Sequence, residues 1–236
     1  MQQYRDTGVV LRTYNLAEAD RIVVLLTAGH GKVRAVAKGI RKTKSRFGGR
    51  LEPLSHVSLL VREGRSLDLV QQVETIDHFR AVREDLDRLT RGAALLEVCD
   101  QLAQEREPAP RLYQMLVGAL RTLGSGTSPL LVAGFQLKVL AQEGVEPQVE
   151  ACVSCGAEGP LVAFDPSEGG TLCRACRRGV AVSPDALELV RMVLGGRLVE
   201  ALAAPPSAAT HEVEVLAAKA MEHHLERRLR SSGLLS

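Results

Sequence analysis

The chain has 236 residues, of which 45% are hydrophobic and 25% charged, the composition of an ordinary globular protein with one large or two small domains. No apolar run approaches the roughly 20 residues that a membrane helix needs, and the first residues lack the apolar core of a signal peptide. We therefore expect a cytoplasmic protein that makes no membrane contact.

The charges are distributed unevenly along the chain, although the net charge is only +2. Residues 1–80 carry 14 Lys and Arg against 8 Asp and Glu, a balance of +6, whereas residues 81–236 carry 16 against 20, a balance of −4. A basic first part joined to a mildly acidic second part indicates that the first part meets a polyanion.

Short β-strands dominate the first 79 residues, because apolar or alternating runs are separated there by turn residues. Five strands are expected: Gly8–Tyr14, Arg21–Thr27, Lys32–Lys38, His56–Arg62 and Ser66–Glu74. Five short strands with one long insertion fit a Greek-key barrel of the oligonucleotide-binding (OB) type. An SH3-like barrel fits the pattern nearly as well. We expect residues 1–79 to form this barrel domain.

The insertion between the third and fourth strands, residues 38–50, is the most basic stretch of the chain. It holds six cations and three glycines in thirteen residues and has no carboxylate. Such a segment cannot lie in a core, because each cation would need a buried partner. It therefore faces either water or an anion, and composition alone leaves both alternatives open. We call it the basic loop.

Helical periodicity replaces the strand pattern near Asp77, and we expect residues 80–236 to form an α-helical domain. The expected helices are Phe79–Glu105, Pro110–Leu123, Ser128–Gly144, Ala186–Leu194 and Ala208–Arg230. Ser-Pro pairs at residues 128–129 and 183–184 are typical helix starts. Cys99 lies at an apolar position of the first helix, so we interpret it as a core residue.

Four cysteines form two C-x-x-C pairs, with seventeen residues between the pairs. Two such pairs supply the four thiolates that a tetrahedral zinc ion accepts, so we predict a Zn²⁺ site in a ribbon at about 150–179. Its ligands are Cys152, Cys155, Cys173 and Cys176. Incidental or redox-active thiols are the alternative. Four protein ligands leave no position for a water nucleophile, so the metal is expected to be structural.

Three arginines, at 174, 177 and 178, lie in and just after the second cysteine pair. They either offset the negative charge of the thiolates or contact DNA or protein, and the sequence favours neither interpretation.

Catalytic motifs are missing from the sequence. The six histidines are scattered, and there is no H-E-x-x-H, nucleophile elbow or phosphate-binding G-x-x-x-x-G-K-[ST] motif. We therefore expect a non-enzymatic protein. The predicted fold class is α+β, with an N-terminal OB-fold β-barrel followed by an α-helical domain with an inserted four-cysteine zinc ribbon.

Residues 8–14, 18–27, 31–32 and above all 37–54 resemble the N-terminal domain of the bacterial RecO family of recombination mediators. The later order, a helical domain interrupted by a four-cysteine ribbon, is similar to that family too. The resemblance implies a role in recombinational repair by the RecF pathway. It implies binding of single- and double-stranded DNA, annealing of complementary strands and, with RecR, loading of RecA on DNA covered by single-stranded-DNA-binding protein (SSB). In the family the helical domain is understood to receive the C-terminal tail of SSB.

On this hypothesis the barrel contacts DNA phosphates through the cations of the basic loop and of the strand before it. These residues are Lys32, Arg34, Lys38, Arg41, Lys42, Lys44, Arg46 and Arg50. Tyr14 and Phe47 are the aromatic side chains near them, and Phe47 is also interpreted as a hydrophobic plug of the barrel. Two alternatives stay open: a protein-interaction scaffold whose basic loop binds an acidic protein surface, and an RNA-binding protein.

Overall fold

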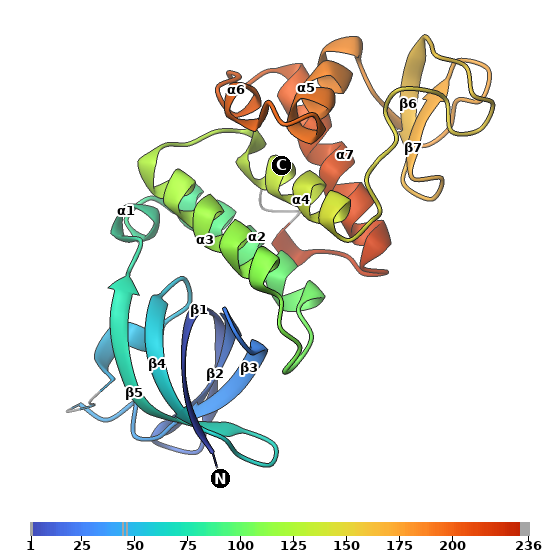
Figure 1. Ribbon diagram of the computed structural model, residues 1–236. Coiled ribbons are helices and arrows are strands. Elements are labelled where there is room, and N and C mark those ends of the chain that lie inside the picture. Colours follow the sequence, from blue (N-terminus) through green and yellow to red (C-terminus); the bar gives the residue numbers. More distant parts are fainter. Residues whose placement is uncertain (1, 44, 46, 232–236) are drawn as a thin grey trace. The chain divides into compact units, whose positions relative to one another are not determined.

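The computed structural model describes residues 2–43, 45 and 47–231 (Figure 1). Its contacts divide the chain into two compact units, Met1–Ser125 and Gly126–Ser236. Within the described residues, the first unit contains the predicted barrel together with three α-helices and a short 3-10 helix, Gly48–Leu51, and the second contains the cysteine ribbon and four further α-helices.

The first unit is built on a closed barrel of five strands (Figure 1). The strands are β1 Gln3–Leu16, β2 Asp20–Thr27, β3 Gly31–Ala37, β4 His56–Arg62 and β5 Asp68–Asp77. Their order is β1-β2-β3-β5-β4, and β4 closes the barrel by pairing with β1. This order confirms the OB-type barrel and excludes the SH3-like alternative.

Strand β1 is longer than the sequence predicted, because it serves two neighbours in turn. Its first part pairs with β4 from Gln3 to Val9, and its second part pairs with β2 from Gly8 to Leu16. A β-bulge between Val10 and Arg12 lies in the second part. Such a bulge increases the local twist that lets one strand curl from one neighbour to the next.

The barrel core follows from the alternation of each strand. In β3, Val33, Ala35 and Ala37 point inward and are buried. The basic loop also contributes to the core, since Phe47 is only 1% exposed and belongs, together with Ile40 of the loop, to the buried core cluster. The interpretation of Phe47 as a hydrophobic plug is therefore confirmed, and its ring is not available for stacking on a base.

Three helices complete the first unit: α1 Arg80–Arg83, α2 Leu86–Leu102 and α3 Pro110–Ser125. The prediction of one continuous helix over residues 79–105 was wrong. The break occurs because Asp85 adopts an extended conformation and its carboxylate accepts the backbone N–H of Arg88, which starts a new helix. Cys99 is fully buried on α2, as expected of a core residue.

The connection between α2 and α3 completes the barrel at the edge of β3. Strand β3 pairs with β5 only at Ala35 and Val36. Ahead of these residues, Lys32 donates its backbone N–H to the carbonyl of Gln104 at 3.2 Å and accepts the N–H of Arg106 at 3.0 Å. Gly31 has a φ of +63°, and a Cβ there would lie 1.7 Å from the carbonyl oxygen of Glu107. Glycine therefore permits this close approach.

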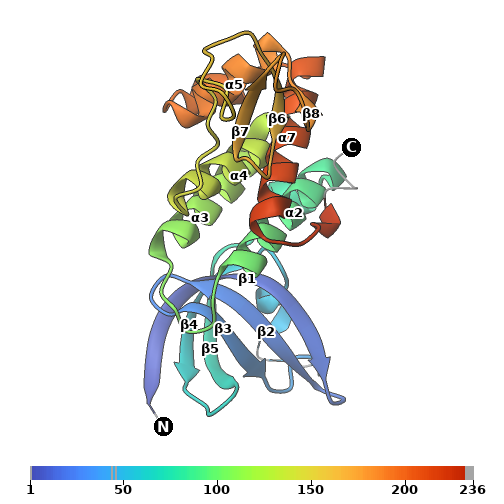
Figure 2. The same ribbon diagram turned by 90° about the vertical axis from the view of Figure 1, so that its right-hand side faces the viewer.

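In its described residues, the second unit contains four α-helices and a small sheet, whose three strands are labelled in Figure 2. The helices are α4 Leu130–Gln142, α5 Pro184–Leu194, α6 Leu198–Leu202 and α7 Ala208–His224. Ser183 caps α5, as predicted, by accepting the N–H of Ala186. Helix α7 ends six residues before the predicted Arg230, because the chain turns at Glu226 with a φ of +50°. Within the described residues, no helix is long and apolar enough to span a membrane.

The sheet is a ribbon of three strands inserted between α4 and α5. The strands are β6 Leu161–Asp165, β7 Gly170–Cys173 and β8 Val180–Ala181, in the order β7-β6-β8. The strands β6, β7 and β8 have only five, four and two residues, so this ribbon has little apolar core of its own. A further constraint is needed to stabilise so small a sheet.

Candidate nucleic-acid interface and metal centre

The described cations of the basic loop lie on the surface. Lys38, Arg41, Lys42 and Arg50 are all exposed. The guanidinium of Arg41 donates to the carbonyl of Ala17 at 3.5 Å, and that of Arg50 donates to the carbonyl of Phe47 at 3.3 Å. Lys38 and Lys42 have no side-chain partner within the described part of the chain. Cations that are not neutralised by carboxylates produce a positive potential that attracts an anion. Lys44 and Arg46 lie outside the described residues.

The base of the basic loop is fixed to the hairpin between β1 and β2. The backbone N–H of Gly39 donates to the carboxylate of Asp20 at 2.7 Å, and that of Arg41 donates to the carbonyl of Ala19 at 3.0 Å. On the far side of the loop, the guanidinium of Arg21 binds the carboxylate of Glu52 at 2.7 Å. These anchors hold both ends of the loop to the barrel, so its cations are presented from a defined place.

Lys32 and Arg34 are placed differently from the loop cations. The ammonium of Lys32 donates to the backbone carbonyl of Asp100 at 2.6 Å and lies 3.7 Å from its carboxylate, and the side chain is only 15% exposed. Arg34 forms a 3.3 Å ion pair with Glu105 at the surface. The geometry of Lys32 favours a structural role, in which it joins the barrel to α2, over the DNA contact that the sequence suggested.

Asp100 is the residue of this network that the sequence reasoning missed. Its carboxylate is buried on α2 and binds Arg12 at 2.7 Å as well as Lys32. The sequence did contain a signal, because Asp100 directly follows the buried Cys99 on the apolar side of the helix. A carboxylate in such a position needs a cationic partner from another element.

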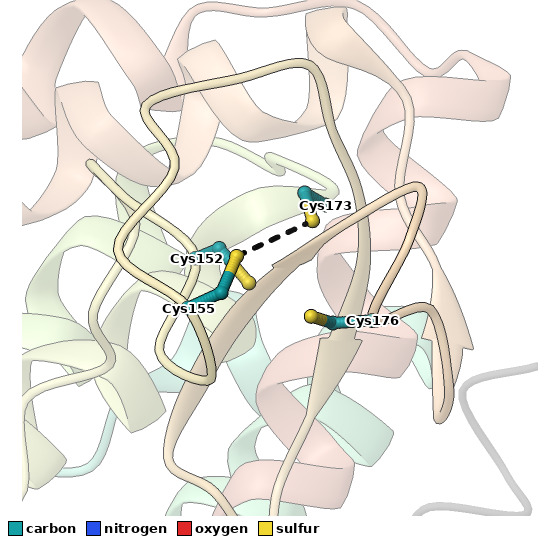
Figure 3. A group of neighbouring side chains, drawn as sticks. All are labelled: Cys152, Cys155, Cys173 and Cys176. Carbon is teal, nitrogen blue, oxygen red and sulfur yellow. Dashed lines mark hydrogen bonds between the residues drawn. The ribbon is translucent and has the colours of Figure 1, made fainter.

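The four predicted zinc ligands lie together in the second unit (Figure 3). Their sulfur atoms all lie within 4.8 Å of one another. Cys152 and Cys155 come from the turn before the ribbon, whereas Cys173 ends β7 and Cys176 follows in the next turn. All four cysteines are free of disulfide bonds.

The spacing of the sulfur atoms fits a metal ion. Zinc–sulfur bonds of about 2.3 Å in a tetrahedron place the sulfur atoms about 3.8 Å apart. The Sγ atoms of Cys155 and Cys173 lie 3.7 Å apart. The pKa of the Cys152 thiol is lowered to about 6, chiefly because the backbone N–H of Cys173 donates to its sulfur, and this favours the thiolate that binds metal. The cluster could hold a metal ion.

The arginines beside the cluster do not behave alike. Arg178 forms ion pairs with Asp165 at 2.9 Å and with Glu168 at 2.6 Å, both from the β6–β7 hairpin. This pairing fixes the end of the ribbon and occupies the Arg178 guanidinium. Arg174 and Arg177 are exposed, and among the described residues neither has an ion-pair partner.

The second unit also contains an apolar hollow of about 200 Å³ between α4 and α7. Val132 and Ala133 of α4 and Val215 and Ala218 of α7 line it, together with polar and charged residues that include Glu214, Lys219 and Glu222. No sequence pattern distinguishes these residues, because apolar residues on two helix faces are typical of a core as well as of a binding surface.

The fold and the two sites define a class of protein: an OB-like barrel with a surface-exposed basic loop, followed by a helical domain with a ribbon whose four clustered cysteines could hold a metal ion. Comparison with protein families gives two matches. The family model described as "Recombination protein O N terminal" matches residues 1–79, and that described as "Recombination protein O C terminal" matches residues 83–233. The chain therefore belongs to the RecO family, whose members are recombination mediators in DNA repair.

The first family match ends at residue 79 and the second begins at residue 83, whereas the two compact units meet at Ser125/Gly126. The helices α2 and α3 match the C-terminal family model but belong to the same compact unit as the barrel. The domain boundary at 79/80 stays a prediction that fragments of the chain can test.

Proposed function

We propose that this chain is a non-enzymatic recombination mediator that binds single- and double-stranded DNA without strong sequence preference. It anneals complementary strands and, together with RecR, helps to load RecA on SSB-coated DNA in the cytoplasm, in association with the nucleoid. The observation that carries the proposal is the anchored basic loop, whose exposed cations include Lys38, Arg41 and Lys42. Phosphate contacts position a protein on DNA and carry no base information, which suits annealing.

The four-cysteine cluster binds a single structural Zn²⁺ in this proposal. Four thiolates are the donor set that zinc takes in closed structural sites, and bound zinc supplies the constraint that the small ribbon lacks. The SSB contact belongs to the helical unit, as the family resemblance implies, and the apolar hollow between α4 and α7 is its candidate position.

The test combines DNA binding with annealing on SSB-coated strands. A loop variant with Lys38→Glu, Arg41→Glu and Lys42→Glu should lose most of its DNA affinity and its annealing activity. In the wild-type chain, about six neutralised phosphates on a single strand predict a slope near −4 for log affinity against log salt. A wild-type slope near zero would contradict the proposal.

A matched control separates the site from the net charge. Reversal of Arg65, Arg80 and Arg111 changes the net charge by the same amount, and these three exposed cations lie in the same unit outside the basic loop. DNA affinity should change far less than in the loop variant.

If the loop variant still bound DNA but no longer bound its protein partners, the scaffold alternative would be favoured. Preference for RNA over a matched DNA strand would favour an RNA-binding protein.

A further inference from the structure

Residues 17–21 comprise the turn after β1 and the first two residues of β2, and they contact the start of the basic loop and the segment just after it. Because β2 and β3 are antiparallel, the first residues of β2 lie beside the last residues of β3, and Arg21 is in register with Ala37. The basic loop starts at the next residue, Lys38. The topology therefore places residues 17–21 beside the loop, and we call them the anchor segment.

Asp20 makes the central contact of the anchor segment. Its carboxylate accepts the backbone N–H of Gly39 at 2.7 Å, and a hydrogen bond to a carboxylate is about twice as strong as one between neutral groups. The carbonyl of the preceding Ala19 accepts the backbone N–H of Arg41 at 3.0 Å. Gly39 has a φ of +70°, a conformation that glycine adopts without strain. Two backbone groups at the start of the loop are thus fixed to the anchor segment.

The first cations of the basic loop lie on the turn that Asp20 fixes. The backbone N–H of Lys42 donates to the carbonyl of Gly39 at 3.1 Å, which closes the turn. Within this turn, Ile40 is buried and belongs to the core cluster of the barrel. The exposed side chains of Arg41 and Lys42 therefore extend from a backbone whose first residue is the partner of Asp20.

The charge of Asp20 and its contact with Gly39 have opposite effects on DNA binding. A carboxylate beside a phosphate-binding surface repels the ligand, so electrostatics alone predicts that its removal raises the affinity. A loop that must be ordered when DNA binds loses affinity instead, and fixing the backbone of a single residue costs about a factor of ten. The sign of the change in affinity therefore shows which effect dominates.

We propose that Asp20 is a positioning residue for DNA binding, whose carboxylate fixes the start of the basic loop before phosphates arrive. The ion pair between Arg21 and Glu52, at 2.7 Å, has the same role for the segment just after the loop. This inference rests on the proposed function and deepens it, because it assigns a favourable role in DNA binding to a residue whose charge repels phosphate.

Affinities of the full-length chain for a single strand, at one salt concentration, test the proposal. Asp20→Ala should weaken binding about tenfold. Glu18→Ala is the matched control, because it removes an exposed carboxylate of the same segment that has no side-chain partner among the described residues. It should leave the affinity unchanged or raise it by up to about threefold. Asp20→Asn retains an oxygen acceptor for Gly39 and should bind DNA about as tightly as the wild type.

Limited digestion with trypsin gives a readout that does not involve DNA, because trypsin cuts after exposed Lys and Arg residues where a segment opens locally. Cleavage after Arg41 and Lys42 should be about tenfold faster in Asp20→Ala than in the wild type. It should be unchanged in Glu18→Ala and Asp20→Asn. A circular dichroism melt checks that each variant is folded.

Glu52→Ala tests the other end of the loop, and it replaces Asp20→Ala if that variant does not fold. It also removes a negative charge, yet it should weaken binding about twofold to fivefold, because a partly exposed ion pair contributes less than the Asp20 contact.

Three results would overturn the proposal: a rise in affinity for Asp20→Ala like that for Glu18→Ala, an equal loss of affinity in Asp20→Asn and Asp20→Ala, or an unchanged rate of cleavage in Asp20→Ala. Failure of the wild-type chain to bind DNA would instead overturn the proposed function. The cleavage rates would then still show whether Asp20 fixes the loop.

Discussion

His56 is a buried histidine that joins the barrel to α3. The Tyr113 hydroxyl donates to Thr7 at 2.9 Å, so its oxygen is left to accept Nε2–H of His56 at 2.7 Å. Nδ1 of His56 is then buried without a hydrogen-bond partner among the described residues. The pKa of His56 lies below its ordinary value, chiefly because the ring is buried and to a smaller extent because of the positive charge of Arg121.

The lowered pKa of His56 predicts a loss of stability in mild acid. The unfolded chain takes up this proton at about pH 6.5, before the folded chain does. The contribution of neutral His56 is therefore complete above that pH, and it falls with decreasing pH by at most about 1.4 kcal/mol per unit. Urea unfolding at pH 7.5 and 5.5, followed by tyrosine fluorescence, should show a smaller decrease for His56→Gln than for the wild type. Equal decreases would contradict the prediction.

At the site, the roles of some single residues could be predicted from the sequence, and the roles of others could not. The exposure of Arg41 and Lys42 followed from a loop too charged to be buried. The partner of Lys32 could not be predicted, because Asp100 lies 68 residues away and only the tertiary fold brings them together. Phe47 was assigned to the core as one of two interpretations, since a single aromatic residue in a basic loop suits either a plug or a stacking surface.

At the scale of elements, the sequence predicts the bounds of a strand or helix well where these bounds are determined by the element's own residues. The bounds of β4 were predicted without error, because Gly, Pro and charged residues flank an apolar run. The pairing of β3 with the segment around Gln104 had no local signal, because an edge is completed by whatever segment the fold brings there. The short helix α6 was missed for a similar reason, since five residues carry too little periodicity.

The metal that the cysteine ribbon could hold is expected to have a structural role. A Cys155→Ser/Cys173→Ser variant should lose its bound zinc, measured as metal per chain, and its ribbon should become sensitive to proteolysis. DNA affinity should stay within about twofold of the wild type, because the basic loop belongs to the other compact unit.

Cys99→Ala is the matched control, because Cys99 is buried in α2 and takes no part in the cluster. It should keep one zinc per chain. The urea transition seen by tyrosine fluorescence should be unchanged in the ribbon variant, since all three tyrosines lie in residues 1–125. A large loss of DNA affinity in the ribbon variant would contradict a structural role for the metal.

At the scale of the whole molecule, the barrel and the helices α1–α3 form one compact unit. A fragment of residues 1–79 would lose the backbone partners of Lys32, the Arg106 partner of Asp68 and the Tyr113 partner of His56. A buried polar group left without its partner costs about 1–3 kcal/mol. We therefore expect fragment 1–79 to be poorly folded and fragment 1–125 to unfold cooperatively in urea.

Circular dichroism and amide NMR spectra of the two fragments measure this difference. Fragment 1–125 should also retain the salt dependence of DNA binding of the full chain, because it contains all the cations assigned to the interface. Equal stability of the two fragments would show that the barrel folds without the helices, and it would place the domain boundary at residue 79.

The segment that completes the edge of β3 also sets the timing of folding during synthesis. The last barrel strand ends at Asp77, but the backbone partners of Lys32 follow at Gln104 and Arg106. At about 5–20 residues per second, the ribosome needs roughly 1–6 s to add this stretch. During this interval the nascent chain has an unpaired β-strand edge beside its most basic segment. Nascent chains of this protein are thus expected to depend on chaperones or on rapid translation of residues 78–107.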